Sequence, residues 1–195
     1  MLNKMRNHVG SHILHSLCEI EDPKECRLQP VGENPCGFCG QGSCFTQLKA
    51  KKHGGLSITS NCSYHYAGMN YKAAAQFSKS LPCTNVPIHC PLCPTAISGD
   101  PQTIWKYNAL YHLISEHSTG GPPLIPGELL VQIFITKEEE RALGIQERAT
   151  INWRKETTFQ TVMVFRKYYK ICRKEADLIQ FQQQLLIVMT QKDIN

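Results

Sequence analysis

Long apolar runs are missing from this chain: none of its 195 residues lies in an uninterrupted apolar stretch of the about 20 residues that a bilayer-spanning helix needs. The stretch "MLNKMRNHVGSHILHSL" is polar and His-rich, without the continuous apolar region of a secretory signal peptide. Aromatic residues make up only 8%, so a large aromatic core is not expected. A P-loop, a Ser-His-Asp set and a carboxylate cluster are also missing, and we therefore predict no enzymatic activity, no small-molecule substrate and no membrane partner.

Cysteine, in contrast, is abundant. The chain has ten cysteines, several of them in pairs separated by two residues and close to histidines. This spacing is typical of metal ligands rather than of disulfides. The formal net charge of +5 is mild, and it does not by itself identify a nucleic-acid partner.

The strongest motif lies in the stretch "HCPLCPTAISGDPQTIWKYNALYHLISEH", residues 89 to 117. Its two cysteines are three positions apart, and its two histidines are five positions apart on a predicted helix that starts at Asn108 as N-cap. Two thiolates on a tight turn and two imidazoles on one helical face are the ligands of a Cys2His2-like zinc finger. The predicted zinc ligands are Cys90, Cys93, His112 and His117.

A second zinc site is predicted in the cysteine-rich region that precedes the finger. The turn "PCGFCG" has the form of a zinc knuckle, because its glycines let backbone amides close around a thiolate. The spacing does not settle the ligand set. We favour Cys36, Cys39, Cys62 and Cys83, with Cys44 or His65 as substitutes. The chain should therefore bind two zinc ions.

The pairs in this region also suggest a RING, the fold of many ubiquitin ligases. A RING needs a cysteine two or three residues beyond its histidine, so that its two sites interleave. After His65 the sequence continues "YAGMNY", and the next cysteine is Cys83. A RING-like ubiquitin ligase is therefore the third of our functional hypotheses.

The finger lacks the side chains of a base-reading module. In the usual helix register its base-facing residues are Trp105, Tyr107, Asn108 and Tyr111. Arg, Lys or Gln would be expected there, because their donors match base edges in the major groove. We therefore expect the finger to be structural, or to contact a protein or a nucleic-acid shape, rather than to read bases.

The segments after the finger carry local structural signals. Residues 118 to 128, "STGGPPLIPGE", form a predicted linker, and "LLVQIFI" follows as a strand or buried apolar segment. Thr136 and Glu139 form a capping box, and Gly144 marks the end of that helix. The run "KEEER" within it is predicted to be a solvated face. Before the finger, "LSITSN" alternates in the manner of a strand.

The C-terminal region is predicted to be one long basic helix from Thr158 to about Thr190. Apolar pairs recur every seven residues, which gives a coiled-coil-like seam and the possibility of a homodimer. Residues 151 to 174 carry seven cationic side chains, namely Arg154, Lys155, Arg166, Lys167, Lys170, Arg173 and Lys174, against the single acid Glu156. A basic helix followed by an apolar heptad resembles a zipper-like element that binds DNA or RNA. A soluble amphipathic helix packed on its own domain is an equal alternative.

The motifs "PCGFCG", "PCTNVPIHCPLC" and "WKYN" give residues 30 to 140 a resemblance to anonymous Cys2His2-like zinc-finger proteins of mushroom-forming (basidiomycete) fungi. The resemblance implies zinc binding and descent from a mobile element, and it implies no established activity.

The first residues predict a further, incomplete finger. His8 and His12 are one helical turn apart, and Met5 lies three residues before the first of them. We expect their cysteine pair to lie upstream, which would make this chain a fragment of a longer protein. Cys18 and Cys26 could complete the site only by folding back.

The sequence thus predicts an α+β protein made of small zinc-stabilised modules and a long C-terminal helix. The expected segments are an N-terminal half-finger and linker (1–30), a cysteine-rich zinc module (31–88), the finger (89–117), a linker with a strand and short helix (118–150), and the basic helix (151–195). The favoured function is that of a nuclear, nucleic-acid-associated zinc protein. The alternative is a protein-interaction adaptor, nuclear or cytoplasmic, that dimerises through its C-terminal helix.

Overall fold

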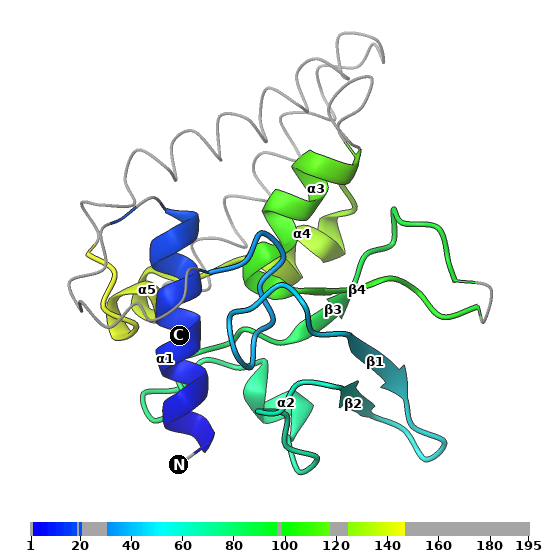
Figure 1. Cartoon of the computed structure of the whole chain (residues 1–195), viewed down its shortest axis with the longest axis horizontal. Coiled ribbons are helices and arrows are strands. Elements are labelled where there is room, and N and C mark those ends of the chain that lie inside the picture. The colour runs from blue at the N-terminus through cyan, green and yellow to red at the C-terminus, as the bar shows by residue number, and fades with distance from the viewer. Residues whose placement is uncertain (1, 19, 21–30, 97–98, 118–124, 147–195) are drawn as a thin grey trace, which may run out of the picture.

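The computed structural model of the protein describes residues 2–18, 20, 31–96, 99–117 and 125–146 (Figure 1). The described part is a mixture of helices and small antiparallel sheets, so the predicted α+β class is confirmed. The predicted C-terminal helix, its basic face and its heptad seam lie outside the described residues.

In chain order the elements are α1 (Leu2–Leu17), β1 (Thr46–Ala50), β2 (Leu56–Ser60), α2 (Tyr71–Ala74), β3 (Pro87–His89), β4 (Thr103–Trp105), the 3-10 turn η1 (Lys106–Asn108), α3 (Ala109–His117), α4 (Gly127–Ile133) and α5 (Lys137–Ala142).

Two antiparallel hairpins form the β structure. β1 pairs with β2 so that Thr46 lies opposite Ser60, which confirms the strand predicted from "LSITSN". β3 pairs with β4, with Pro87 opposite Trp105. The two hairpins are linked to each other through side chains: the Leu48 amide donates to Thr103 Oγ1 at 3.1 Å, and the Leu48 carbonyl oxygen lies 2.9 Å from His89 Nε2. The two sheets therefore remain separate but pack side by side.

The apolar clusters of the core join residues from different predicted segments of the chain. One apolar cluster joins the hairpin β3–β4 to α3 and α4, with Leu113 and Leu129 among its fully enclosed members. A second cluster joins α1 to the region around α5, and a third surrounds Phe38 and Trp105. Residues 125–146 thus pack on the same body as the finger, although the sequence placed them after a linker.

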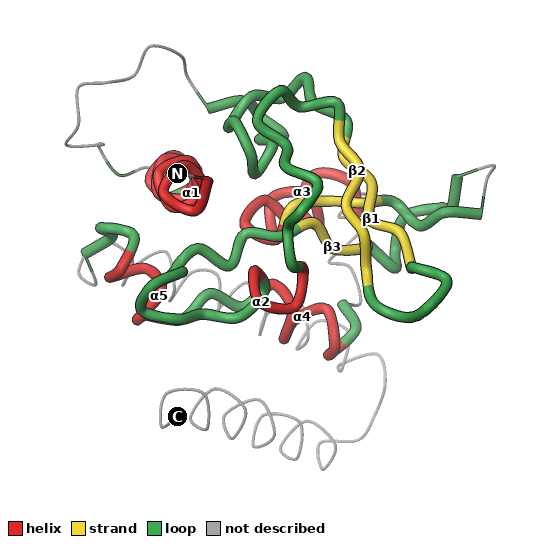
Figure 2. Tube along the Cα trace, turned by 90° about the horizontal axis from the view of Figure 1, so that it is seen from below, coloured by secondary structure: helices red, strands yellow, loops and turns green. Residues whose placement is uncertain are grey.

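α1 lies along one side of this body, on the side away from β1 and β2 (Figure 2). Its buried residues Val9, Ile13 and Leu14 form one face, as the helical period requires. On the same element the buried Arg6 guanidinium donates from Nη2 to the carbonyl oxygens of Cys83 at 3.1 Å and Asn85 at 3.3 Å. Apolar packing and a buried cation therefore both hold α1 in place.

The apolar run "LLVQIFI" is mainly a helix, and the expectation of a strand was wrong. α4 covers Gly127–Ile133, and its Leu129 is buried in the first cluster. Leu129, Leu130 and Ile133 follow the i, i+1, i+4 spacing of one helical face, which an unbroken apolar run conceals. None of the helices in the described part of the chain is both long and apolar enough to cross a lipid bilayer.

α5 has the predicted ends but not the predicted exposure. The Thr136 hydroxyl caps it by accepting from the Glu139 amide at 3.1 Å, and Gly144 ends it with a φ of +85°. The prediction that "KEEER" is a solvated face was wrong, because Glu139 and Glu140 are both buried.

Glu139 is buried because it belongs to a polar cluster between α5, η1 and the approach to β3. Its Oε1 accepts from the Thr84 amide at 2.9 Å, from the Thr84 hydroxyl and from the Tyr107 hydroxyl. The Lys106 ammonium lies 3.8 Å from its other oxygen and donates to the Thr84 hydroxyl. Burial, followed by the neighbouring Cys83 and Glu139, raises the pKa of Tyr107 well above its usual value. A buried carboxylate is tolerated here because three donors reach one of its oxygens and an ammonium lies near the other.

Candidate metal centres

The finger is built by the hairpin β3–β4 and by α3. Cys90 directly follows β3, and its amide is tied to the Gln102 carbonyl oxygen at 2.9 Å, just before β4 begins. α3 runs back over the hairpin, and its buried Leu113 anchors it to the first cluster (Figure 1). His112 and His117 therefore face the turn that carries the two cysteines. This is the predicted arrangement.

The four predicted ligands of the finger come together. One ligand atom from each of them lies within 4.8 Å of all the others. Sγ of Cys93 is 3.2 Å from His112 Nε2 and 3.3 Å from His117 Nε2, and Sγ of Cys90 is 3.4 Å from His117 Nε2. In a tetrahedral zinc site, sulfur and nitrogen ligands are separated by about 3.5 Å. The cluster thus has the size of a four-ligand metal site.

The surroundings of the finger cluster fix the protonation of two of its members. Desolvation by burial, together with the neighbouring Cys90, raises the pKa of the Cys93 thiol to about 12. Burial also lowers the pKa of His112, and the adjacent His117 lowers it further. The imidazole of His112 is therefore neutral at pH 7 and ready to bind a metal, whereas the Cys93 thiol has to lose a proton.

The second cluster consists of Cys36, Cys39, Cys44 and Cys62, whose sulfur atoms all lie within 4.8 Å of one another. The first two belong to the predicted knuckle: the Gly40 amide donates to the Cys36 carbonyl oxygen at 2.7 Å, and Gly40 has a φ of +78°. This left-handed conformation suits glycine and closes the turn beneath the two sulfur atoms. Sγ of Cys39 lies 3.5 Å from Sγ of Cys44.

The hairpin β1–β2 brings the other two sulfur atoms of this cluster together. Thr46 lies opposite Ser60, so Cys44 and Cys62, each two residues outside that pair, also lie opposite each other. Asn61 continues the pairing beyond the strands, because its amide donates to the Phe45 carbonyl oxygen and its side chain accepts from the Phe45 amide. The register of the hairpin therefore places Cys44 beside Cys62, within the cluster.

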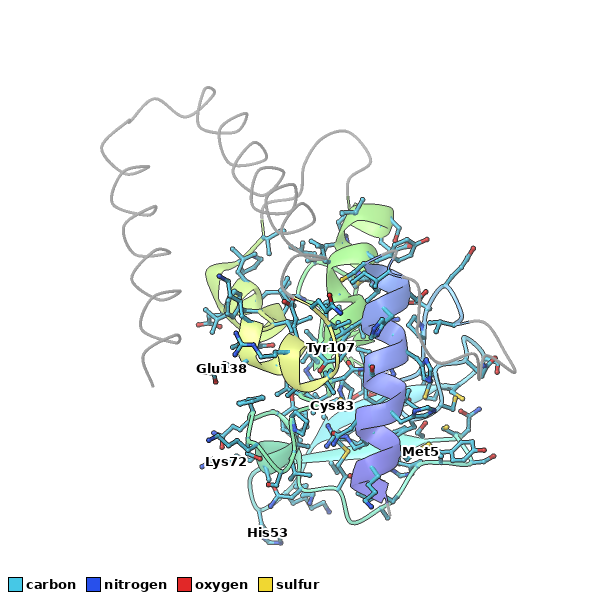
Figure 3. The ribbon with its side chains drawn as sticks, turned by 90° about the vertical axis from the view of Figure 1, so that its left-hand side faces the viewer. Met5, His53, Lys72, Cys83, Tyr107 and Glu138 are labelled. Atoms are coloured by element: carbon cyan, nitrogen blue, oxygen red, sulfur yellow. The ribbon has the colours of Figure 1, made fainter. Side chains whose placement is uncertain are left out.

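The preferred ligand Cys83 is not part of either cluster, and this part of the prediction is corrected. Cys83 is buried against α1 and Tyr107 (Figure 3), where burial raises the pKa of its thiol. Cys44, one of the two substitutes, takes its place. The other substitute, His65, contacts the ring of Phe38 edge-on at 5.2 Å and lies outside the cluster.

The thiols of this cluster differ in acidity. Burial raises the pKa of Cys36 far above its usual value, and burial together with the adjacent Cys39 raises that of Cys44 to about 12. Burial acts in the same direction on Cys39, but the Gln41 amide and the neighbouring thiols outweigh it and lower the pKa. The thiol of Cys39 therefore ionises more readily than those of Cys36 and Cys44.

No family model, curated protein or solved structure matches this chain. The resemblance to fungal zinc-finger proteins therefore stays a prediction, and function has to be argued from the residues themselves.

The order of the ligands bears on the RING hypothesis. All ligands of the first cluster, Cys36 to Cys62, precede all ligands of the second, Cys90 to His117. In a RING the two sets interleave along the chain. The described clusters therefore follow each other in sequence, as two modules would.

The base-facing residues of the finger are mostly enclosed. Trp105, Tyr107 and Asn108 are all buried, and only Tyr111 is exposed. Asn108 is not the predicted N-cap: its side-chain amide donates to Asn34 Oδ1, and its own Oδ1 has no partner in the described part of the chain. α3 is preceded instead by the 3-10 turn η1. The face that would enter a major groove is thus used for packing.

Proposed function

We propose that this protein is a nuclear, nucleic-acid-associated protein whose fold is held together by two structural zinc ions. The observation that carries the zinc proposal is the pair of four-ligand clusters, one of four cysteines and one of two cysteines and two histidines. Thiolate and imidazole ligands in tetrahedral sets favour zinc among the common divalent ions. Four protein ligands leave no open position for substrate, which suits a structural role rather than a catalytic one.

Elemental analysis of single variants tests the zinc proposal. Cys36→Ser and Cys90→Ser should each lose one zinc equivalent relative to the wild-type protein at saturating zinc, and the double variant should lose two. Chelation should unfold the wild-type chain, because folding and the formation of structural zinc sites are coupled. A wild-type protein that keeps its circular dichroism spectrum after complete removal of zinc would contradict the structural role.

Nucleic-acid association is supported by charge rather than by the finger. Beyond the finger, residues 151 to 174 contain seven Lys and Arg against one acid. In the described part, Lys51 and Lys52 are exposed at the turn of the hairpin β1–β2, next to His53, which Figure 3 labels at the edge of the molecule. Both cationic segments could contact phosphates without reading bases.

An electrophoretic mobility shift assay over a salt series tests this association. Changing Arg166, Lys167, Lys170, Arg173 and Lys174 to Gln should remove most of the binding and leave only the weak contribution of Lys51 and Lys52, whereas Asn108→Ala should leave it almost unchanged. The wild-type affinity should fall steeply between about 50 and 200 mM salt, because released counterions drive phosphate binding. Loss of preference for one DNA sequence in the Asn108 variant would instead make the finger a base reader.

A protein-interaction adaptor is the second candidate, and α3 supplies an observation that favours it. Tyr111 and Ile114, three residues apart on one side of the helix, are 47% and 49% exposed. Apolar side chains on a rigid helix are suited to contact a protein partner. Sedimentation equilibrium at low and high salt would distinguish the two candidates: a salt-independent dimer without nucleic-acid binding supports the adaptor.

A further inference from the structure

A pair of histidines on α1 has the geometry of metal ligands. His8 and His12 are four residues apart on the helix, so their side chains lie one above the other. Their Nε2 atoms are 3.1 Å apart, and the ring centroids are 4.3 Å apart with the planes at 87°. The two nitrogens are thus close enough either to share a proton in a hydrogen bond or, with both nitrogens unprotonated, to bind one ion.

The finger of the same chain provides a standard for this geometry. There the rings of His112 and His117 lie 5.2 Å apart with the planes at 74°, and their Nε2 atoms approach the sulfur ligands to between 3.2 and 3.4 Å. Two imidazole nitrogens on one tetrahedral zinc ion are separated by about 3.3 Å. The Nε2 atoms of His8 and His12, 3.1 Å apart, fall close to this value, although their rings lie closer together than those of the finger.

The helix that carries the pair is fixed, so the two imidazoles need little ordering when an ion arrives. Val9 and Ile13, each next in sequence to one of the histidines, are buried in the second apolar cluster. His8 lies on the outward side, where it is exposed, and Met5, three residues earlier, is 38% exposed. His12 is partly buried, so an ion would approach the pair from the side of His8.

We propose that His8 and His12 bind a third transition-metal ion through their Nε2 atoms, in addition to the ions of the two cysteine-containing clusters. Imidazole nitrogen selects zinc, nickel or copper over calcium and magnesium, and zinc is the ion that the proposed function already supplies. Two ligands one turn apart fill half of a tetrahedral shell and leave two positions for further ligands. A bound ion would also join two successive turns of α1.

The test compares metal content in matched histidine variants of the full chain, purified with zinc and dialysed against a weak chelator. The wild-type protein should retain one more zinc equivalent than His12→Asn. The control, His53→Asn, removes an exposed histidine at the turn between β1 and β2 and should retain as much zinc as the wild type. Equal zinc content in all three proteins would overturn the proposal, as would a third ion that dialysis removes from the wild type.

A measurement on the wild-type protein covers the case in which His12→Asn does not fold. Zinc is added to protein already loaded with two equivalents, while the imidazole resonances are followed by NMR. The third equivalent should shift the resonances of His8 and His12 and leave that of His53 in place. A third equivalent that shifts neither His8 nor His12 overturns the proposal. If the two cysteine-containing clusters did not bind zinc, Cys36→Ser and Cys90→Ser would have the same zinc content as the wild type. That result is separate from the behaviour of His8 and His12.

Discussion

Gly10 of α1 lies against the sulfur atom of Cys83: a Cβ placed on the glycine would come within 2.5 Å of Sγ, and within 3.3 Å of the ring of Tyr107. The helix can approach the core this closely only because residue 10 has no side chain. The contact also gives a packing role to Cys83, which belongs to neither metal cluster. Cys83 acts here as a small buried apolar group.

Gly10→Ala should therefore destabilise the protein. Overpacking in a tight core costs about 1–3 kcal/mol, which outweighs the gain of up to about 1 kcal/mol in helix propensity. Gly127→Ala is the matched control, because it is also helical and a Cβ there meets nothing within 4 Å. Urea unfolding of the zinc-loaded proteins should show a loss of stability for the first variant and none for the second. Equal stability would mean that α1 can shift without cost.

Cys44→Ser should remove one zinc equivalent, because Cys44 supplies one of four sulfur atoms in its cluster. Cys83→Ser should retain the full wild-type content, although it can lower stability by placing a hydroxyl in an apolar site. Elemental analysis of the two variants beside the wild type decides between the ligand sets. The opposite result, with zinc lost only from the Cys83 variant, would restore the ligand set favoured from sequence.

Glu139→Gln should cost about 3 kcal/mol of unfolding free energy, since it removes the buried negative charge that faces the Lys106 ammonium. The neighbouring Glu138 is exposed on the same helix, where Figure 3 labels it. Glu138→Gln should therefore change stability by less than about 0.5 kcal/mol. Chemical denaturation of both variants at pH 7 measures the difference. Two equally small effects would show that the buried ion pair contributes little.

Zinc binding should release protons at neutral pH, and the affinity should fall as the pH is lowered. The pKa values of Cys44 and Cys93 are about 12, and that of Cys36 is also raised, so all three thiols are protonated at pH 7 and have to ionise on binding. His112, with its lowered pKa, adds no proton at this pH. Calorimetric titrations in two buffers of different ionisation enthalpy should reveal at least about three released protons. Heats that do not depend on the buffer would contradict these pKa directions.

Signals that depend on neighbouring residues in the chain were predictable from sequence. The ligands of the finger, the strand at Leu56–Ser60, the Thr136 cap and the Gly144 stop all follow from short-range patterns, and each is found in the structure. The knuckle at Cys36 and Cys39 belongs to the same group. These motifs can be recognised from the spacing of their residues or from the backbone conformation that a residue type favours.

Features that depend on distant residues were not predictable in this way. The choice of Cys44 over Cys83 follows from the register of the hairpin, and β1 itself had not been recognised in "TQLKA". Recognising β1 would have paired Thr46 with Ser60, and this register places Cys44 opposite Cys62. The burial of Glu139 could not be inferred from "KEEER", because its partners Thr84 and Lys106 lie far away in the sequence.

The contact between Gly37 and Trp105 joins the two metal centres. Gly37 lies between the cysteines of the knuckle, and a Cβ there would come within 2.3 Å of the indole of Trp105, the last residue of β4 in the finger. Trp105 also contacts the ring of Phe38 edge-on at 5.0 Å. When one centre is empty, the packing that supports the other is weakened. At limiting zinc, binding of the first ion should therefore raise the affinity of the same molecule for the second, whereas at saturating zinc one centre still fills when a mutation has removed the other.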